Sequence, residues 1–234
     1  ALEGFEPEEL VVDLVFRLET LGTFLDALHA RGVTQVCFCG AIDRPRLRLG
    51  RLDLKTLPLV PTFLRALKLG DDGALRALIS LFEAKGFAVL GADALLAGLT
   101  MAAGVVTRAT PQEAHQGLPK LGREVLLRMG QADLGQACVL RGQDILAQED
   151  VTGTDAMLAR FLSGGQGKGA VLFKAPKPNQ DRRADLPTIG PKTAAAAVTA
   201  GFDGIILEAD GVIVLDQPQV IETLNEAGLF LWLV

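Results

Sequence analysis

The stretch from Val171 to Lys192 constrains the fold of this chain more than any other segment. It opens in an apolar run at residues 170–173, which is typical of a short buried strand. A charged loop follows, and its four prolines (176, 178, 187 and 191) stiffen the backbone because proline fixes φ. Charged loops that begin at a strand end often carry sites. The charge cluster at 181–185 is equally typical of a solvated surface turn, so both interpretations stay open here.

Helix and strand patterns alternate through the first 98 residues. Residues 18–31 have leucines at helical spacing and are followed by Gly32, and residues 34–39 then show a buried-strand pattern. Residues 74–85 and 87–90 repeat this order of helix, glycine and strand. We therefore predict an N-terminal Rossmann-like αβ domain over residues 1–98, with a small parallel sheet.

The rest of the chain predicts a second α/β unit. Residues 99–130 are expected to connect the domains and to end in a helix, and residues 131–234 to form a C-terminal mixed α/β domain. The expected strands are 136–140, 143–147, 170–173, 205–207, 212–215 and 229–234, and the expected helices are 154–162, 193–200 and 217–227. Thr154 or Asp155 is expected to cap its helix, and Asp210–Gly211 to join two strands in a hairpin.

The composition excludes several classes of function. Aromatic residues make up only 5% of the chain and the net charge is −5, so binding of nucleic acid through stacked bases or a polyanion-binding surface is not expected. Two histidines and three cysteines without ligand spacing argue against zinc sites and Ser-His-Asp hydrolysis. No G-x-G-x-x-G follows a strand, which disfavours an NAD enzyme. The cysteine usage is that of a reducing cytosol.

Three polar loops follow expected strands or begin expected helices: 153–155, 174–177 and 181–188. Their cations and backbone N–H groups suit phosphoryl oxygens, and their carboxylates suit Mg²⁺ or Mn²⁺. Asp181 and Asp185 are four residues apart, so a single helical turn would place both on one face. Residues 153–155 taken alone are more typical of a plain helix cap, and Glu149 is expected to be solvated rather than metal-bound. In the first half, Gly40 and Arg44 could cradle a phosphate or belong to an exposed basic loop.

The second half carries a dense, ordered resemblance to one family. Its motifs are T-D-A-M-L-A-R from Thr154, K-A-P-K-P-x-Q-D-R-R-x-D-L-P-T-I-G from Lys174, G-I-x-L-E-A from Gly204 and A-G-L-F from Ala227. Through them the chain resembles the UDP-2,3-diacylglucosamine pyrophosphatases of lipid A biosynthesis, of the LpxI type without a calcineurin-like metallophosphatase fold. The string that begins at Lys174 is the most specific motif, and looser matches extend the resemblance through the first half.

The resemblance implies a two-domain hydrolase that holds its substrate between the domains. It would split UDP-2,3-diacylglucosamine into lipid X (2,3-diacylglucosamine 1-phosphate) and UMP, with Mg²⁺ or Mn²⁺ as cofactor. It would act in the cytoplasm of a Gram-negative bacterium. Transient contact with the inner-membrane surface and a homodimer are left open, and no nucleic-acid partner is expected.

The family's essential acidic residue falls in the segment Q-D-R-R-x-D-L-P. The resemblance therefore makes Asp185 the first choice and Asp181 the second, as catalytic residues and as metal ligands. Lys174 and Arg182 would neutralise phosphate charge. The further substrate contacts expected are Gly153, Thr154, Asp155, Thr188, Gly190, Gly40 and Arg44.

The chain departs from the family at its start. Relatives usually begin with a strand and a Gly-rich turn before the segment that matches residues 1–4, so we expect the first sheet to lack a central strand. The two acyl chains of the substrate also need an apolar groove, and no stretch of sequence identifies it. A non-catalytic nucleotide-sugar or acyl-lipid binding protein is the competing hypothesis, although it gives no reason for the acidic pair close to Lys174.

Overall fold

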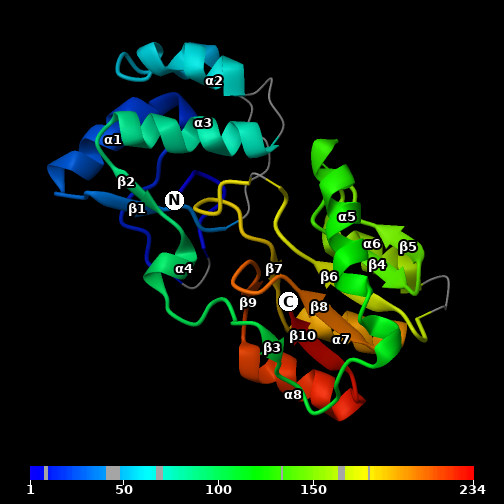
Figure 1. The fold of residues 1–234 in the computed structure, drawn as a ribbon. Coiled ribbons are helices and arrows are strands. Elements are labelled where there is room, and N and C mark those ends of the chain that lie inside the picture. Colours follow the sequence, from blue (N-terminus) through cyan, green and yellow to red (C-terminus); the bar gives the residue numbers. More distant parts are fainter. Residues whose placement is uncertain (8–9, 41–47, 67–70, 133, 163–166, 179) are drawn as a thin grey trace. The chain divides into compact units, whose positions relative to one another are not determined.

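The structure is a computed structural model that describes residues 1–234 except 8–9, 41–47, 67–70, 133, 163–166 and 179 (Figure 1). Its contacts divide the chain into two compact units, Ala1–Ala92 and Asp93–Val234, which we call unit 1 and unit 2. Within the described ranges, no helix has the length and apolar character needed to cross a membrane.

Unit 1 is made mainly of helices around one short strand pair. Its elements are η1 (Leu18–Thr20), α1 (Leu21–Ala30), β1 (Gln35–Cys37), η2 (Leu49–Arg51), η3 (Leu57–Leu59), α2 (Val60–Ala66), α3 (Asp71–Ala84) and β2 (Ala88–Leu90). The two strands run parallel, with Val36 opposite Val89. Gly32 and Gly86 follow α1 and α3 with φ values of +73° and +87°, which glycine adopts without strain. The predicted helix–glycine–strand order and the small parallel sheet are confirmed.

Unit 2 contains a six-stranded mixed sheet. Its elements are α4 (Ala92–Leu95, beginning at the boundary between the units), β3 (Gly104–Val105), η4 (Glu113–His115), α5 (Leu118–Gln131), β4 (Ala137–Arg141), β5 (Asp144–Gln148), α6 (Gly153–Leu162), β6 (Val171–Lys174), β7 (Thr188–Ile189), α7 (Pro191–Ala200), β8 (Gly204–Leu207), β9 (Ile213–Val214), α8 (Gln217–Ala227) and β10 (Phe230–Leu233). The strand order is β3-β10-β8-β6-β4-β5. β6, β8 and β10 run parallel, whereas β3, β4 and β5 pair with their neighbours in antiparallel fashion.

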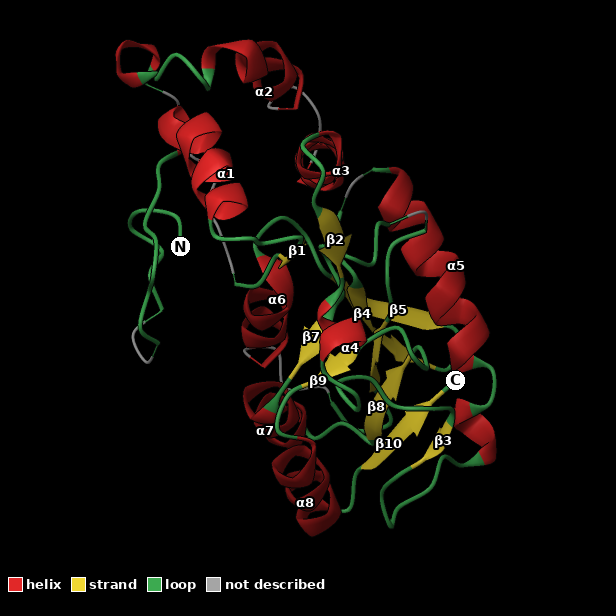
Figure 2. Cartoon of the chain, turned by 90° about the vertical axis from the view of Figure 1, so that its left-hand side faces the viewer, coloured by secondary structure: helices red, strands yellow, loops and turns green. Residues whose placement is uncertain are grey.

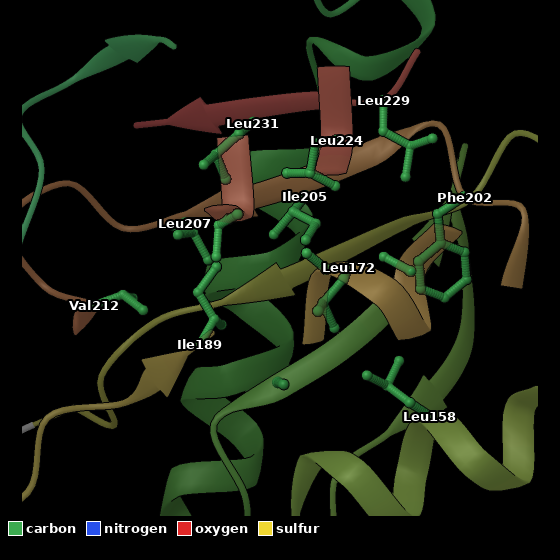
Figure 3. Packing of buried hydrophobic residues seen from close by; sticks show 14 of the residues in the cluster. Leu158, Leu172, Ile189, Phe202, Ile205, Leu207, Val212, Leu224, Leu229 and Leu231 are labelled. Atoms are coloured by element: carbon green, nitrogen blue, oxygen red, sulfur yellow. The ribbon is translucent and has the colours of Figure 1, made fainter. Parts of the chain in front are cut away.

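Helices cover both faces of this sheet. Figure 2 shows α5 on one side and α6, α7 and α8 on the other. The side chains alternate between these faces, as the two-residue period of a strand requires. In β6, Leu172 belongs to the core on the side of α6–α8, and Phe173 to the core under α5. Figure 3 shows Leu172, Ile205 and Leu231 converging in the first of these cores.

Residues 99–130, which were expected to connect the domains, contribute directly to the sheet layers of unit 2. β3 is an edge strand on β10, and Val125, Leu126 and Met129 of α5 are buried against β4 and β6.

The expected hairpin through Asp210–Gly211 is wrong. β8 lies between β6 and β10 and pairs with both in parallel, while β9 pairs in parallel with β7 in a separate two-stranded sheet. All four residues of β8 are buried. A fully apolar strand is stabilised most at the centre of a sheet that is covered on both faces. For this reason β8 lies in the centre of the six-stranded sheet and does not form a β-hairpin with β9.

Candidate active site

The carboxyl-terminal edge of the unit 2 sheet brings together polar residues that are far apart in sequence. Lys174 is the last residue of β6 and lies opposite Ala137 at the start of the antiparallel strand β4. Gln136 precedes β4, and Glu149 follows β5, whose last residue, Gln148, pairs with Cys138. The three side chains therefore start from one edge of the sheet. In open α/β sheets, ligands bind outside the carboxyl ends of the parallel strands.

Lys174 is the centre of a hydrogen-bonded group at this edge. The side chain is only 7% exposed, and its Nζ donates to Thr154 Oγ1 over 2.7 Å. The Thr154 hydroxyl in turn donates to Glu149 Oε2 at 3.0 Å, and the same oxygen accepts the Gln136 backbone N–H at 3.0 Å. A buried ammonium group is thus connected to a carboxylate through one hydroxyl.

Asp185 lies on the other side of Gln136. Its Oδ2 accepts hydrogen bonds from Gln136 Nε2 at 3.3 Å and from Gln180 Nε2. Gln180 is itself held by the Lys177 backbone N–H, which donates to Gln180 Oε1 at 2.9 Å. The carboxylate of Asp185 is therefore oriented by two amides. We call the group of Gln136, Glu149, Thr154, Lys174, Gln180 and Asp185 the Lys174 network.

Burial lowers the pKa of Lys174 below its usual range, because removal from water disfavours the charged ammonium form. The charges of Glu149, Asp155 and Asp185 oppose this effect and favour the ammonium. The site thus combines a desolvated cation with surrounding carboxylates. Such a cation interacts strongly with an incoming phosphoryl oxygen, since little water screens it.

Gly135 allows Glu149 to reach the network. A Cβ at position 135 would lie 2.2 Å from Glu149 Cγ and 2.4 Å from its Cβ, closer than any real contact. Only glycine at this position leaves room for the carboxylate to accept the Gln136 N–H. The sequence G-Q before β4 is thus part of the site's construction.

Asp181 has a different environment from Asp185. Its carboxylate accepts hydrogen bonds from Arg183 Nε at 3.0 Å and Nη2 at 2.8 Å. The backbone makes a turn in which the Ala184 N–H donates to the Asp181 carbonyl, and Asp185 follows that turn. This single turn does not continue as a helix, and the two carboxylates have different partners: Arg183 for Asp181, and Gln136 with Gln180 for Asp185.

The two carboxylates proposed as metal ligands do not complete a ligand set in this arrangement. Among the residues that the structure describes, no three His, Cys, Asp or Glu side chains gather where they could hold a metal ion. The divalent cation stays a prediction from the resemblance.

The remaining predicted contacts of unit 2 lie around the network or beside it. Gly153 and Asp155 are in the first turn of α6, next to Thr154. Gly190 precedes α7, and the Thr188 hydroxyl donates to the Leu186 carbonyl at 3.2 Å. The guanidinium of Arg182 is exposed and donates to the Asp210 carbonyl.

Two of the predicted substrate contacts, Gly40 and Arg44, belong to unit 1. Gly40 is exposed, with a φ of +97° shortly after β1. Arg44 lies outside the described residues. Their proposed part in phosphate binding stays a prediction.

Sequence reasoning missed three members of the network: Gln136, Gln180 and Glu149. Glu149 was expected to be solvated, but it is half-buried and accepts two hydrogen bonds. Thr154 was expected as a possible helix cap, but α6 begins at Gly153 and the Thr154 hydroxyl bonds to Glu149 instead. Their positions in the sequence could have indicated Gln136 and Glu149. Gln136 precedes and Glu149 follows two strands that pair in a hairpin, so both residues lie at the same edge of the sheet.

Comparisons with known proteins agree with these motifs. The model of the LpxI N-terminal domain matches residues 1–99, and that of the LpxI C-terminal domain matches residues 102–232. A curated relative from Caulobacter vibrioides, named UDP-2,3-diacylglucosamine pyrophosphatase LpxI, is 35% identical over 216 residues. The match covers 89% of this chain and 77% of the relative.

Proposed function

This chain belongs to the LpxI family, and on that premise we propose that it hydrolyses the diphosphate bond of UDP-2,3-diacylglucosamine in lipid A biosynthesis. It is a hydrolase that acts on a phosphoric anhydride. The observation that carries the proposal for its site is the Lys174 network, in which a buried ammonium and an oriented carboxylate lie at one edge of the sheet.

We propose separate roles for the two charged groups. Lys174 binds a phosphoryl oxygen and stabilises the negative charge that develops there as the bond to the bridging oxygen breaks. Asp185 accepts a proton from the attacking water, so that the water oxygen forms the new bond to phosphorus. UMP leaves on one side and the 1-phosphate of 2,3-diacylglucosamine on the other. Gln136 and Gln180 orient the carboxylate for this step.

Glu149 and Thr154 support Lys174 rather than the reacting atoms. The Thr154 hydroxyl accepts from the ammonium and donates to Glu149, which fixes the position of Nζ. We propose Asp181 as the second choice after Asp185 for the catalytic carboxylate, because the guanidinium of Arg183 already binds the Asp181 carboxylate. Arg182, Asp155, Thr188, Gly153 and Gly190 are proposed as further substrate contacts in unit 2.

Several finer points belong to the same proposal. The enzyme is proposed to use Mg²⁺ or Mn²⁺, to work in the cytoplasm, to lack a calcineurin-like metallophosphatase fold and to have a Rossmann-like unit 1. The parallel β1–β2 pair supports the last point. Contact with the inner-membrane surface and self-association stay predictions.

The test is the release of UMP and lipid X from intact UDP-2,3-diacylglucosamine in detergent by the purified protein. Parallel reactions contain Mg²⁺, Mn²⁺ or a chelator. We expect both products in equal amounts with a divalent ion and little turnover with the chelator. Binding of the substrate without release of UMP under all conditions would instead support the non-catalytic binding protein.

A further inference from the structure

Unit 2 contains a groove that no predicted site residue except Arg182 touches. It has a volume of about 470 Å³ and lies between α5 and the loop after β6. Its lining residues are Arg123, Leu126, Leu127, Ala175, Pro176, Lys177, Pro178, Gln180, Arg182, Glu208 and Ala209. We call it the α5 groove.

The walls of the α5 groove are fixed by close packing. Pro178 lies against α5, where a Cβ at Gly130 would be 2.8 Å from the Pro178 Cδ. Pro176 lies against the segment after β8, where a Cβ at Gly211 would be 3.1 Å from the Pro176 Cδ. Both prolines therefore hold the loop between α5 and residues 208–211. The groove is a built feature of the fold, not a gap beside a loose loop.

The lining separates into an apolar part and a charged part. The apolar part consists of two leucines of α5 together with alanine and proline side chains, and the side chain of Leu127 is 49% exposed. The charged part includes Arg123, which pairs with Glu208 over 3.0 Å, and also Lys177 and Arg182. The border thus holds three cations and the carboxylate of Glu208, and an apolar surface with such a net positive border fits an amphiphile with an anionic end.

The groove also adjoins the Lys174 network. Gln180 lines the groove and donates to Asp185 from its Nε2. Gln180 therefore connects the groove directly to the carboxylate of Asp185 within unit 2. The two features differ in chemistry: the network is polar and buried, whereas the groove is largely apolar.

We propose that the α5 groove binds one acyl chain of the substrate, with the cations at its border facing the phosphate end. This inference rests on the proposed hydrolysis of a diacylated sugar nucleotide. It assigns to this groove the apolar surface that the two-chain substrate requires and that the sequence did not identify. Leu127 becomes a residue that determines acyl-length specificity.

The experiment measures kcat/KM for substrates with short acyl chains of increasing length, which stay monomeric in water. For the wild type we expect a gain of up to about fourfold per methylene group, the value for removing a CH₂ from water. Leu127→Ser should reduce this gain to about twofold per methylene, since part of the apolar wall is lost. Leu127→Trp, which fills the groove, should affect long chains more than the shortest one.

Two control variants separate the acyl chain from other effects. Leu96→Ser removes a leucine of unit 2 that is 62% exposed and outside the groove, so the wild-type gain per methylene should persist. Arg123→Gln should lower kcat/KM by a similar factor at every chain length, because its charge faces the phosphate end.

The outcomes distinguish this inference from the function on which it rests. A wild type that hydrolyses all substrates with no dependence on chain length would overturn the acyl site and leave the hydrolase intact. The same conclusion follows if Leu127→Ser and Leu127→Trp keep the wild-type dependence. A wild type that hydrolyses none of the substrates would overturn the proposed function itself.

Discussion

The sheets of the two units differ in how completely they are buried. In unit 2, Val139, Leu172 and Ile206 on three neighbouring strands have no exposed surface. In unit 1, β1 has no fully buried residue, and Val89 is the one buried residue of β2. The unit 2 sheet is covered by helices on both faces, whereas the described strand pair of unit 1 is short and partly open.

This difference explains where a buried charge can be held. A lysine loses solvation when it is buried, so it needs partners at fixed positions. The rigid strands β4 and β6 provide such positions for Gln136 and Lys174. In unit 1, by contrast, the ion pairs of Lys55 with Asp26 and of Arg17 with Glu3 are exposed. We therefore propose that the reacting centre lies in unit 2.

Among the variants that compare the two units, the largest effect should come from removing the buried lysine. Lys174→Met keeps the length of the side chain and removes the charge, so we expect kcat/KM to fall by about 10²–10³-fold, as for the loss of one donor to a developing negative charge. Release of UMP under subsaturating substrate measures this.

Lys55→Met is the matched control in unit 1, because Lys55 is 60% exposed and pairs with Asp26 at the surface. We expect its kcat/KM to stay within about twofold of the wild type, as is usual for an exposed ion pair. An equal loss of kcat/KM in Lys174→Met and Lys55→Met would contradict the assignment of the reacting centre to unit 2.

A smaller effect is expected on stability when one valine is shortened in each sheet. Val139→Ala in β4 removes two fully buried carbons, and we expect the free energy of unfolding to fall by roughly 2–3 kcal/mol. Val36→Ala in β1 affects a half-buried side chain, for which less than about 1 kcal/mol is expected.

Denaturant unfolding followed by fluorescence or circular dichroism compares the two valine variants. A Val36→Ala variant that loses as much stability as Val139→Ala would show that β1 is as well covered as β4.

The smallest expected change is in the pH dependence of activity. Burial lowers the pKa of Lys174, so its ammonium loses the proton at a lower pH than an exposed lysine does. We expect kcat/KM to decline on the alkaline side before the ordinary lysine pKa of about 10.4. Between the folded and unfolded pKa values, the unfolded chain holds the extra proton, so the contribution of Lys174 to the free energy of unfolding rises with pH.

Lys174→Arg tests this assignment, because a guanidinium does not titrate in that range. The alkaline decline should disappear in this variant and persist in Lys55→Met. A decline that is unchanged in Lys174→Arg would assign the titration to another group.

Much of the fold could be predicted because local signals agreed with tertiary structure. The helix expected at 217–227 is α8 (Gln217–Ala227), since its amphipathic pattern ends at Gly228 in the left-handed region. The strand expected at 170–173 is β6 (Val171–Lys174), which begins and ends one residue later. In both cases a periodic apolar pattern coincides with a clear stop signal.

The rest depended on long-range pairing that local patterns do not encode. β8 and β9 are close in sequence and have a turn between them, yet each pairs with a strand on which it can be covered. For the site, the motifs that begin at Thr154 and Lys174 indicated three of the six members of the network: Thr154, Lys174 and Asp185. A hairpin of the strands expected at 136–140 and 143–147 brings Gln136 and Glu149 to one edge. Their position beside Lys174 depends on the pairing of β4 with β6, which local patterns do not encode.

The most direct test of the Lys174 network as the reacting centre compares Asp185→Asn with Asp181→Asn. Both changes keep the shape of the side chain and remove a base, and turnover is measured as UMP released at saturating substrate, with substrate binding measured separately. We predict that Asp185→Asn lowers kcat by about 10²–10⁴-fold with binding retained, and that Asp181→Asn has a smaller effect. Full kcat in Asp185→Asn would contradict a catalytic role for the carboxylate that Gln136 and Gln180 orient.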